Sequence, residues 1–264
     1  MDPTLQSELI NIAYRLADCA RVETLKYFRG DKLDTQSKET DGFDPVTQAD
    51  RASEAAMREI LATLRPEDGI LGEEYAPKPS SSGLTWVLDP IDGTRGYVAG
   101  TPTWGVLIAL HDGAEPVLGV IDQPYIGERF TGGFGVAEMV GPLGTHPLRT
   151  RHNTDLAAAT IFTTYPEVGS ADDRAAFEAV AQKCQLTRYG MDCYAYALLA
   201  AGQIDLVIEA GLQAYDIQAP IAVIEAAGGI VTNWEGGAAD QGGRALAAAN
   251  ASLHAQALEI LASV

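Results

Sequence analysis

Two short apolar segments of this chain each end in acidic residues. The first, residues 69–71, leads into Glu73 and Glu74, and the second, residues 84–88, leads into Asp89. Carboxylates that leave water at the end of a buried strand are costly unless a positive charge accompanies them. No Lys or Arg lies within three residues of Glu73 or Asp89. The chain must therefore fold so that a cation reaches these acids.

The second acidic segment, residues 89–94, reads Asp-Pro-Ile-Asp-Gly-Thr and suits a hard divalent cation. Mg²⁺ takes oxygen ligands at about 2.1 Å and accepts shared carboxylates and water. Pro90 stiffens the turn, which fixes Asp89 relative to Asp92 and makes the Ile91 carbonyl a further oxygen ligand. The pattern predicts a magnesium site.

The same segment supplies groups for binding a phosphate. Gly93 lets the backbone approach an anion closely. A helix that starts at Thr94 would direct free backbone N–H groups and the positive end of its dipole at a phosphate oxygen. Metal ions at such a site can activate water for phosphate-monoester hydrolysis, so no nucleophilic side chain is needed. Asp92-Gly93 alone is typical of an ordinary turn, and only the longer pattern favours this chemistry.

Composition limits the class of protein. The chain has 264 residues, 47% of them hydrophobic, which suits one large domain or two lobes around a buried core. Its 36 acidic and 18 basic residues give a net charge of -18, which argues against nucleic acid or an anionic membrane as a partner. No apolar run approaches the roughly 18 residues of a membrane helix, and the first residues lack a signal-peptide pattern. We expect a soluble, cytoplasmic protein with no membrane span.

Hydrophobic spacing in the first half predicts two helices and an antiparallel sheet. The helices are residues 5–28 and 47–64, and the polar stretch 31–44 between them is expected to be an exposed loop or short hairpin that can move. An Asp112-Gly113 hairpin turn joins two of the strands. The predicted strands are residues 69–71, 84–88, 104–111, 117–123 and 127–132.

The second half alternates between strands and helices, which predicts a mixed, layered α/β (α+β) architecture. A boundary between two lobes is expected near residues 145–153. The predicted strands are residues 159–163, 204–209 and 230–232 with a last one from residue 244, and the predicted helices are residues 171–184, 194–201, 216–227 and the end of the chain.

Three motifs together resemble the signatures of the inositol monophosphatase family. They are Gly72-Glu73-Glu74, the turn at residues 89–94, and Tyr215-Asp216 with the later Gly228-Gly229. The resemblance extends over nearly the whole chain. It implies the layered αβαβα sugar-phosphatase fold, which is also that of fructose-1,6-bisphosphatase, and a homodimer. It further implies Mg²⁺ as the cofactor, with two or three ions in each site.

The resemblance assigns the metal ligands. Glu73, Asp89 and the Ile91 carbonyl would hold one ion. Asp89, Asp92 and Asp216 would hold a second, so that Asp89 bridges the two. Asp216 also has a simpler explanation, because Asp before an apolar helix is a common N-cap.

The resemblance also assigns catalytic and phosphate-binding groups. Thr94 would act with Asp50 to orient the attacking water, and Glu73 would take part in the same catalytic group. Gly93 and Thr94 would bind the phosphate. Thr47 and Asp50 open a helix with the spacing of a capping box, which satisfies orphan backbone N–H groups. The two roles of Asp50 are compatible.

The resemblance distributes these groups over two lobes of one compact catalytic unit. Residues 1–148 would form an α+β lobe that carries most of the metal ligands and the phosphate turn. Residues 149–264 would form an α/β lobe that carries Asp216 and the residues that determine substrate specificity.

Within the family, the chain is most similar to the histidinol-phosphatase branch. Residues 92–97 read Asp-Gly-Thr-Arg-Gly-Tyr, whereas Asp-Gly-Thr-x-Asn-Phe is usual in inositol phosphatases. The segments 192–196 and 202–209 also resemble that branch. Histidinol phosphate carries an ammonium group and an imidazole, so carboxylates beyond the phosphate would suit it.

Three residues are candidates for contacting the rest of the substrate. By the resemblance, Glu209 matches in position a family acid that contacts the non-phosphate part of the substrate, and Asp192 is close to where other family members reach the ligand. Both acids could instead be solvated or cap a helix. Arg95 could contact the ligand or form a structural ion pair.

We therefore expect a Mg²⁺-dependent phosphomonoesterase that converts L-histidinol phosphate and water to L-histidinol and phosphate. The alternative is an inositol-1-monophosphatase or another sugar-phosphate phosphatase. A third hypothesis is a catalytically silent regulatory homologue that keeps the fold. The presence of Glu73, Asp89, Asp92, Thr94 and Asp216 argues against the third.

Overall fold

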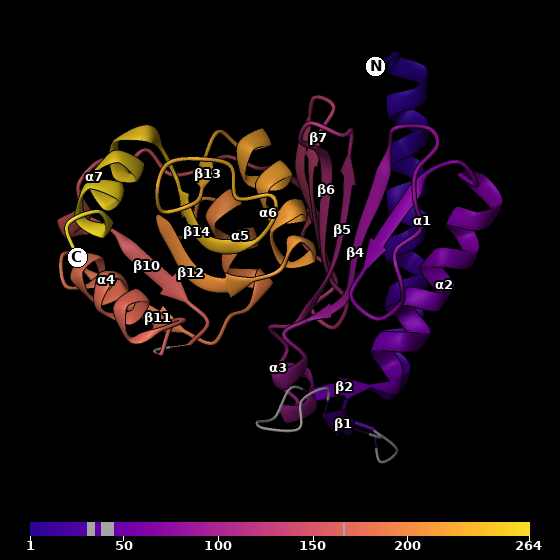
Figure 1. Cartoon of the computed structure of the whole chain (residues 1–264), viewed down its shortest axis with the longest axis horizontal. Coiled ribbons are helices and arrows are strands. Elements are labelled where there is room, and N and C mark those ends of the chain that lie inside the picture. Colours follow the sequence, from indigo (N-terminus) through magenta and orange to yellow (C-terminus); the bar gives the residue numbers. More distant parts are fainter. Residues whose placement is uncertain (31–34, 38–44, 166) are drawn as a thin grey trace.

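The computed structural model describes residues 1–30, 35–37, 45–165 and 167–264, and its elements form five layers (Figure 1). Two helices, α1 (Pro3–Tyr27) and α2 (Gln48–Leu64), cover the outer face of a seven-stranded sheet. A central helical layer separates this sheet from a five-stranded sheet. The last layer packs on the outer face of the smaller sheet. The αβαβα order predicted above is confirmed.

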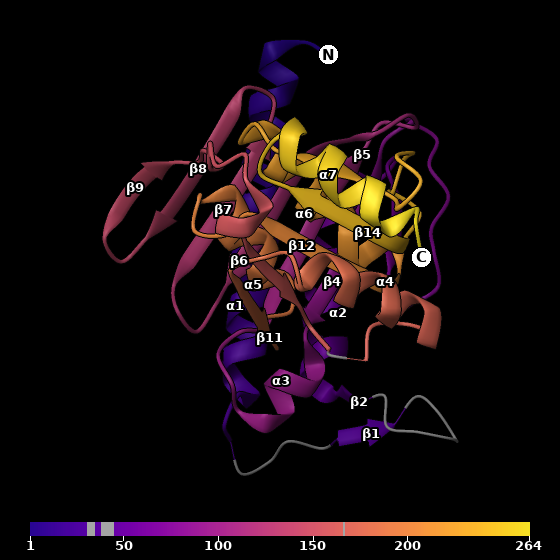
Figure 2. The same cartoon turned by 90° about the vertical axis from the view of Figure 1, so that its left-hand side faces the viewer.

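The seven-stranded sheet has the order β3-β4-β5-β6-β7-β8-β9. Its first two strands are parallel and the others pair antiparallel. In the view of Figure 2, β8 and β9 extend from one edge of the molecule. The strands are β3 (Gly69–Gly72), β4 (Thr85–Asp92), β5 (Gly105–His111), β6 (Pro116–Gln123), β7 (Glu128–Gly133), β8 (Val136–Gly141) and β9 (Gly144–Pro147).

The five-stranded sheet has the order β11-β10-β12-β14-β13. β10 is parallel to both of its neighbours, and β14 is antiparallel to both of its own. Helices α4 (Ala171–Ala181) and α7 (Ala251–Leu261) pack together in the outermost layer. The strands are β10 (Thr160–Thr163), β11 (Leu186–Tyr189), β12 (Leu206–Leu212), β13 (Ile230–Thr232) and β14 (Gly243–Ala248), and a short 3-10 turn, η1 (Leu156–Ala158), precedes them.

The central layer consists of α5 (Cys193–Ala200) and α6 (Ala214–Ala226), and it contacts both sheets. Because apolar surfaces lie on both sides, α6 is buried along the continuous run 217–224. Gly132 lets the helix approach β7 closely, since any Cβ there would clash with the Cα of Val223. Burial between two sheets fixes the N-terminal end of α6, which carries Asp216.

The outer helices α1 and α2 each bury one face against the large sheet and expose the other, which explains their amphipathic sequences. α1 buries Leu9, Ile12, Leu16 and Ala20 at helical spacing against the large sheet. α2 begins after Thr47, whose side chain caps the helix. The short helix α3 (Thr94–Ala99) follows β4 directly, as expected.

Most predicted elements are confirmed within a few residues, with some differences. The helix predicted to end at Cys184 ends at Ala181, and β8, β9 and β11 were not predicted. β1 (Thr35–Ser37) and β2 (Pro45–Thr47) pair antiparallel, which agrees with a short hairpin. The predicted motion of residues 31–44 stays a prediction, and residues 31–34 and 38–44 lie outside the described residues. No helix of the described residues is long and apolar enough to span a membrane. The division at residues 148/149 stays a prediction.

Candidate active site

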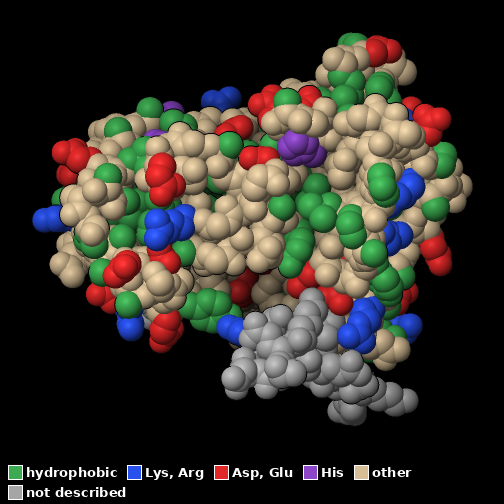
Figure 3. All heavy atoms as spheres, in the orientation of Figure 1, with side chains coloured by type: hydrophobic (Ala, Val, Ile, Leu, Met, Phe, Trp, Pro, Cys, Tyr) green, Lys and Arg blue, Asp and Glu red, His purple; other side chains and the backbone are tan. Residues whose placement is uncertain are grey.

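A pocket of about 420 Å³ lies between the half of the molecule built on the seven-stranded sheet and the half built on the five-stranded sheet, beside the starts of α5 and α6. Acidic side chains are visible in a recess between the two halves of the molecule (Figure 3). The pocket lining combines the end of β4 and the start of α3 with the ends of β10 and β12 and the start of α6. It includes every predicted site residue except Asp50: Glu73, Asp89, Ile91, Asp92, Gly93, Thr94, Arg95, Asp192, Glu209 and Asp216.

Asp89, Asp92 and Asp216 form one group, in which the ligand oxygens all lie within 4.8 Å of one another. A register shift in the pairing of β4 with β5 falls between Asp89 and Asp92. Asp216 lies in the first turn of α6 and accepts a 2.7 Å hydrogen bond from the N–H of Gln213, so it is both a capping residue and a member of the group. The structure thus brings together the three carboxylates expected to share one ion.

The electrostatics of this group favour a bound cation. Burial raises the pKa of Asp89 and of Asp92 well above the ordinary value, and neighbouring carboxylates raise it further. Burial also raises the pKa of Asp216 to about 7. Protonation or a cation relieves such repulsion. Because the donors are carboxylate oxygens with the Ile91 carbonyl nearby, the set fits a hard ion such as Mg²⁺.

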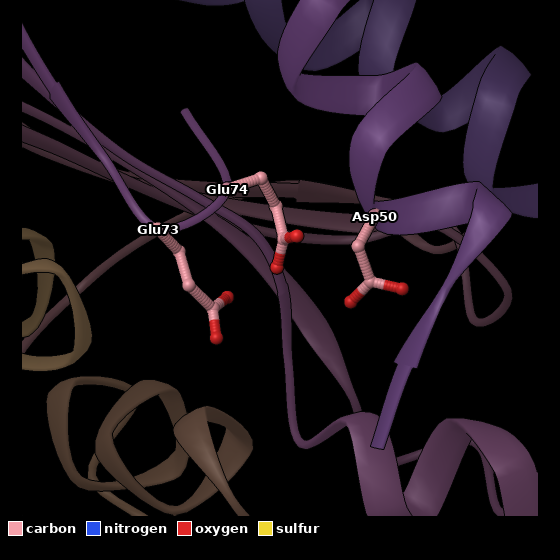
Figure 4. Close-up of side chains that lie close together, drawn as sticks. All are labelled: Asp50, Glu73 and Glu74. Atoms are coloured by element: carbon pink, nitrogen blue, oxygen red, sulfur yellow. The ribbon is translucent and has the colours of Figure 1, made fainter. Parts of the chain in front are cut away.

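A second group consists of Asp50, Glu73 and Glu74, whose ligand oxygens also lie within 4.8 Å of one another. Asp50 comes from the start of α2, the two glutamates come from the turn after β3, and their carboxylates point toward the same region (Figure 4). By the family resemblance, Glu73 was expected to share an ion with Asp89. The structure groups Glu73 with Asp50 and Glu74, although its charge is also close enough to raise the pKa of Asp89.

Glu54 supports this second group and was not predicted. It is fully buried on α2, one turn after Asp50, and its carboxylate accepts a 2.7 Å hydrogen bond from the N–H of Glu74. Arg58 donates to the other oxygen at 2.7 Å. The carboxylate lies against Gly72, where any Cβ would clash with it. Two acids four residues apart at a helix start were the available signal in the sequence.

Thr94 lies between the two groups. Its hydroxyl oxygen is 3.0 Å from the Ile91 carbonyl oxygen and 3.4 Å from Oδ1 of Asp50. The other oxygen of Asp50 accepts hydrogen bonds from the N–H and the hydroxyl of Thr47, which confirms the capping box. Burial raises the pKa of Asp50 to about 6. Asp50 can therefore cap α2 and still interact with Thr94.

The backbone between the phosphate turn and α5 is tightly packed. Gly93 has a φ of 84°, and a Cβ there would lie 2.7 Å from Cγ of Asp192. Asp192 itself has a positive φ of 47°. The N–H of the next residue, Cys193, donates a 2.6 Å hydrogen bond to Asp92. The role of Cys193 was missed, because a backbone donor leaves no signal in a sequence.

Glu209 lies in the pocket wall and is 6% exposed. One carboxylate oxygen accepts from the N–H and hydroxyl of Thr164, and the other accepts from the hydroxyl of Tyr196 at 2.8 Å. Burial raises its pKa, while these hydrogen bonds lower it. A carboxylate has about four acceptor positions, so one remains for a ligand. Thr164 and Tyr196 are supporting residues that the sequence did not indicate.

Arg95 extends from α3 toward the opposite half of the molecule. Its guanidinium carbon lies 5.2 Å from the centroid of the Tyr165 ring. Its charge also lowers the pKa of Asp192, which burial raises. The alternatives for Arg95 were a ligand contact or a structural ion pair, and the structure adds a cation–π contact.

The chain is similar in sequence and in fold to known phosphatases. The sequence profile of the inositol monophosphatase family matches residues 5–264. Bifunctional phosphatase IMPL2, chloroplastic, from Arabidopsis thaliana is 41% identical over 257 residues, which cover 93% of this chain and 72% of that protein. A histidinol-phosphatase from Mycobacterium tuberculosis is 33% identical over 250 residues, covering 94% and 95%. A solved inositol monophosphatase from Zymomonas mobilis superposes with a TM-score of 0.85 at 37% identity, covering 97% and 98%.

Proposed function

The chain belongs to the inositol monophosphatase family and is a phosphoric monoester hydrolase, and we propose that it is a Mg²⁺-dependent histidinol-phosphate phosphatase. It would convert L-histidinol phosphate and water to L-histidinol and phosphate. The observation that carries the choice of substrate is that Asp192 and Glu209 line the same pocket as the predicted metal ligands. Carboxylates there favour a substrate whose non-phosphate part is cationic.

We assign the ions to the carboxylates of the pocket. Asp89, Asp92 and Asp216 would hold one ion, and Glu73 with Asp89 and the Ile91 carbonyl would hold another. Bound Mg²⁺ would neutralise phosphoryl oxygens, acidify water and stabilise the leaving alkoxide. The buried position and raised pKa of these acids support the assignment. We propose that each site binds two or three Mg²⁺ ions.

The chain's own groups would position the reactants. The Thr94 hydroxyl, with Asp50 beside it, would orient the attacking water, and Glu73 would take part through the group it forms with Asp50. Backbone N–H groups at Gly93 and Thr94 would bind phosphate oxygens. These contacts would align the water with the leaving group before bond breaking.

The other end of the pocket would recognise the amine and the imidazole. Glu209 is already oriented by Thr164 and Tyr196, so little side-chain entropy is lost when it binds an ammonium or imidazolium group. A polyol such as inositol carries no positive charge to compensate these acids. Two relatives that are 32% and 33% identical to this chain are named histidinol-phosphatase, which supports the same substrate.

The test is phosphate release with Mg²⁺ from histidinol phosphate, inositol 1-phosphate and other sugar phosphates. We expect kcat/KM to be highest for histidinol phosphate. Glu209→Gln removes a charge-assisted contact and should lower kcat/KM for histidinol phosphate about tenfold more than for inositol 1-phosphate. Higher kcat/KM on inositol 1-phosphate would favour the inositol-monophosphatase alternative, and no turnover of any ester would favour the silent homologue.

The proposal includes two further expectations from the family resemblance. The chain would form a homodimer, which light scattering after gel filtration tests directly. It would act on a small phosphate ester in the cytoplasm, without nucleic acid or a membrane as a partner.

A further inference from the structure

Tyr165 lines the pocket, two residues after β10 ends at Thr163. Its neighbour Thr164 is fixed to the pocket wall, because both its N–H and its hydroxyl bond to Glu209. Tyr165 is 43% exposed, so an incoming ligand can reach it. The backbone that carries the ring is therefore held by the same carboxylate that is proposed to bind the substrate.

Arg95 contacts the Tyr165 ring from the other half of the molecule. Arg95 belongs to α3, which follows the large sheet, whereas Tyr165 follows a strand of the small sheet. The guanidinium carbon lies 5.2 Å from the ring centroid, within the range of a cation–π contact. Among the described residues of the pocket lining, Arg95 is the only one with a positively charged side chain. The pair joins lining residues that follow different sheets, and the contact restricts the orientation of the ring.

We propose that Tyr165 is a specificity-determining residue, whose ring forms a flat wall against which the planar imidazole of the substrate packs. Arg95 is a positioning residue that holds this ring. The inference rests on the proposed function and extends it to a residue that the sequence did not indicate. Planar rings stack on an aromatic face with an offset or meet its edge. A planar imidazole can lie against the ring as an aromatic pair, which a puckered polyol cannot form, so the wall favours a planar nitrogenous ring.

The charges around Tyr165 suit the same ligand. Burial raises the pKa of the Tyr165 hydroxyl and Arg95 lowers it. The negative charges of Asp192 and Asp92 raise this pKa further. The wall therefore lies beside carboxylates as well as beside a guanidinium. A ring that is planar and able to carry a positive charge satisfies both the wall and the acids.

The experiment compares two esters that differ in the ring. Histidinol phosphate has phosphate, ammonium and imidazole, whereas 2-aminopropyl phosphate keeps the phosphate and the ammonium and lacks the imidazole. Tyr165→Leu removes the flat face, and Tyr165→Phe retains it. We expect Tyr165→Leu to lower the ratio of kcat/KM on the first ester to that on the second by about three- to tenfold, the contribution of one aromatic contact. Tyr165→Phe should keep most of the ratio.

A matched control comes from Tyr189 on β11. It is 44% exposed, its ring contacts Phe177, and it is outside the pocket lining. Tyr189→Leu should leave the ratio at its wild-type value. The wild type should prefer histidinol phosphate to inositol 1-phosphate. If it does and the ratio stays unchanged in Tyr165→Leu, only the role of Tyr165 is overturned. If the wild type does not prefer histidinol phosphate to inositol 1-phosphate, the proposed function is overturned, and the role of Tyr165 with it.

Discussion

Asp92 accepts a 2.6 Å hydrogen bond from the backbone N–H of Cys193, although 101 positions separate the two residues. One residue belongs to the end of β4 and the other begins α5. The orientation of a predicted metal ligand therefore depends on packing between the two halves of the chain. The site exists only when both sheets are folded and packed against the central helices α5 and α6.

The contact between Thr94 and Asp50 predicts a loss of rate more than of affinity. Asp50→Asn and Thr94→Val should each lower kcat about a hundredfold with little change in KM, because both residues would orient the attacking water. The double variant should be no worse than either single one, since the two act as a unit. Steady-state kinetics on the four proteins measures this.

A matched control separates this role of Asp50 from capping. Asp173 closes a similar capping box with Ser170 at the start of α4. Asp173→Asn should lower the free energy of unfolding by about 1 kcal/mol or more, because it weakens both the cap and the ion pair with Arg244, and should keep kcat. Equal losses of kcat in Asp50→Asn and Asp173→Asn would show that capping alone explains the effect.

Magnesium should stabilise the protein more at neutral than at acid pH. Without a cation, burial raises the folded-state pKa of Asp216 to about 7 and that of Asp50 to about 6, from 3.8. Between pH 3.8 and these raised pKa values, the folded state binds more protons than the unfolded chain. The contribution of Asp216 and Asp50 to the free energy of unfolding therefore falls as pH rises through this range. A bound cation offsets the repulsion of the ionised groups and competes with protons.

Thermal denaturation with and without Mg²⁺ measures this difference. The rise in Tm caused by Mg²⁺ should be several degrees larger at about pH 7.5 than at about pH 5. Asp216→Asn should reduce both the rise and its dependence on pH. A rise in Tm that is equal at the two pH values would contradict the expected exchange of protons for metal.

Gly93 should tolerate no side chain, because Asp192 occupies the space of its Cβ. Gly93→Ala would bring a Cβ to 2.7 Å from Cγ of Asp192, whereas Gly83→Ala meets nothing within 4 Å. The two glycines have φ of 84° and 88°, so both substitutions share a backbone cost of about 1 kcal/mol. Only Gly93→Ala should lower kcat/KM, on the order of a hundredfold through displacement of the phosphate turn. Activity of Gly93→Ala equal to that of Gly83→Ala would contradict this.

The main elements of the fold were predictable because their patterns are local. The apolar positions of α1 and the strands around Asp112-Gly113 follow regular periods, and the structure confirms them. The strands β9 and β11 were missed because they are short and mostly exposed, so no alternating pattern marks them. Which strands pair is a non-local property that no short window of sequence contains.

The site was predictable in composition but not in detail. Asp89, Asp92 and Asp216 converge as expected because two of them share one turn and the third starts a buried helix. The grouping of Glu73 with Asp50 depends on how α2 packs beside β3, which the spacing does not encode. Contacts such as the cation–π pair of Arg95 with Tyr165 arise only in the folded chain.

We propose that carboxylates from distant segments hold Mg²⁺ and so promote phosphomonoester hydrolysis. The decisive measurement is phosphate release from histidinol phosphate after chelation and again after Mg²⁺ is restored. We expect chelation to reduce the wild-type rate to background, Mg²⁺ to restore it, and Asp92→Asn to stay near background in both conditions. A chelated wild type that keeps its full rate, or an Asp92→Asn variant as active as the wild type, would show that hydrolysis does not depend on these metal ligands.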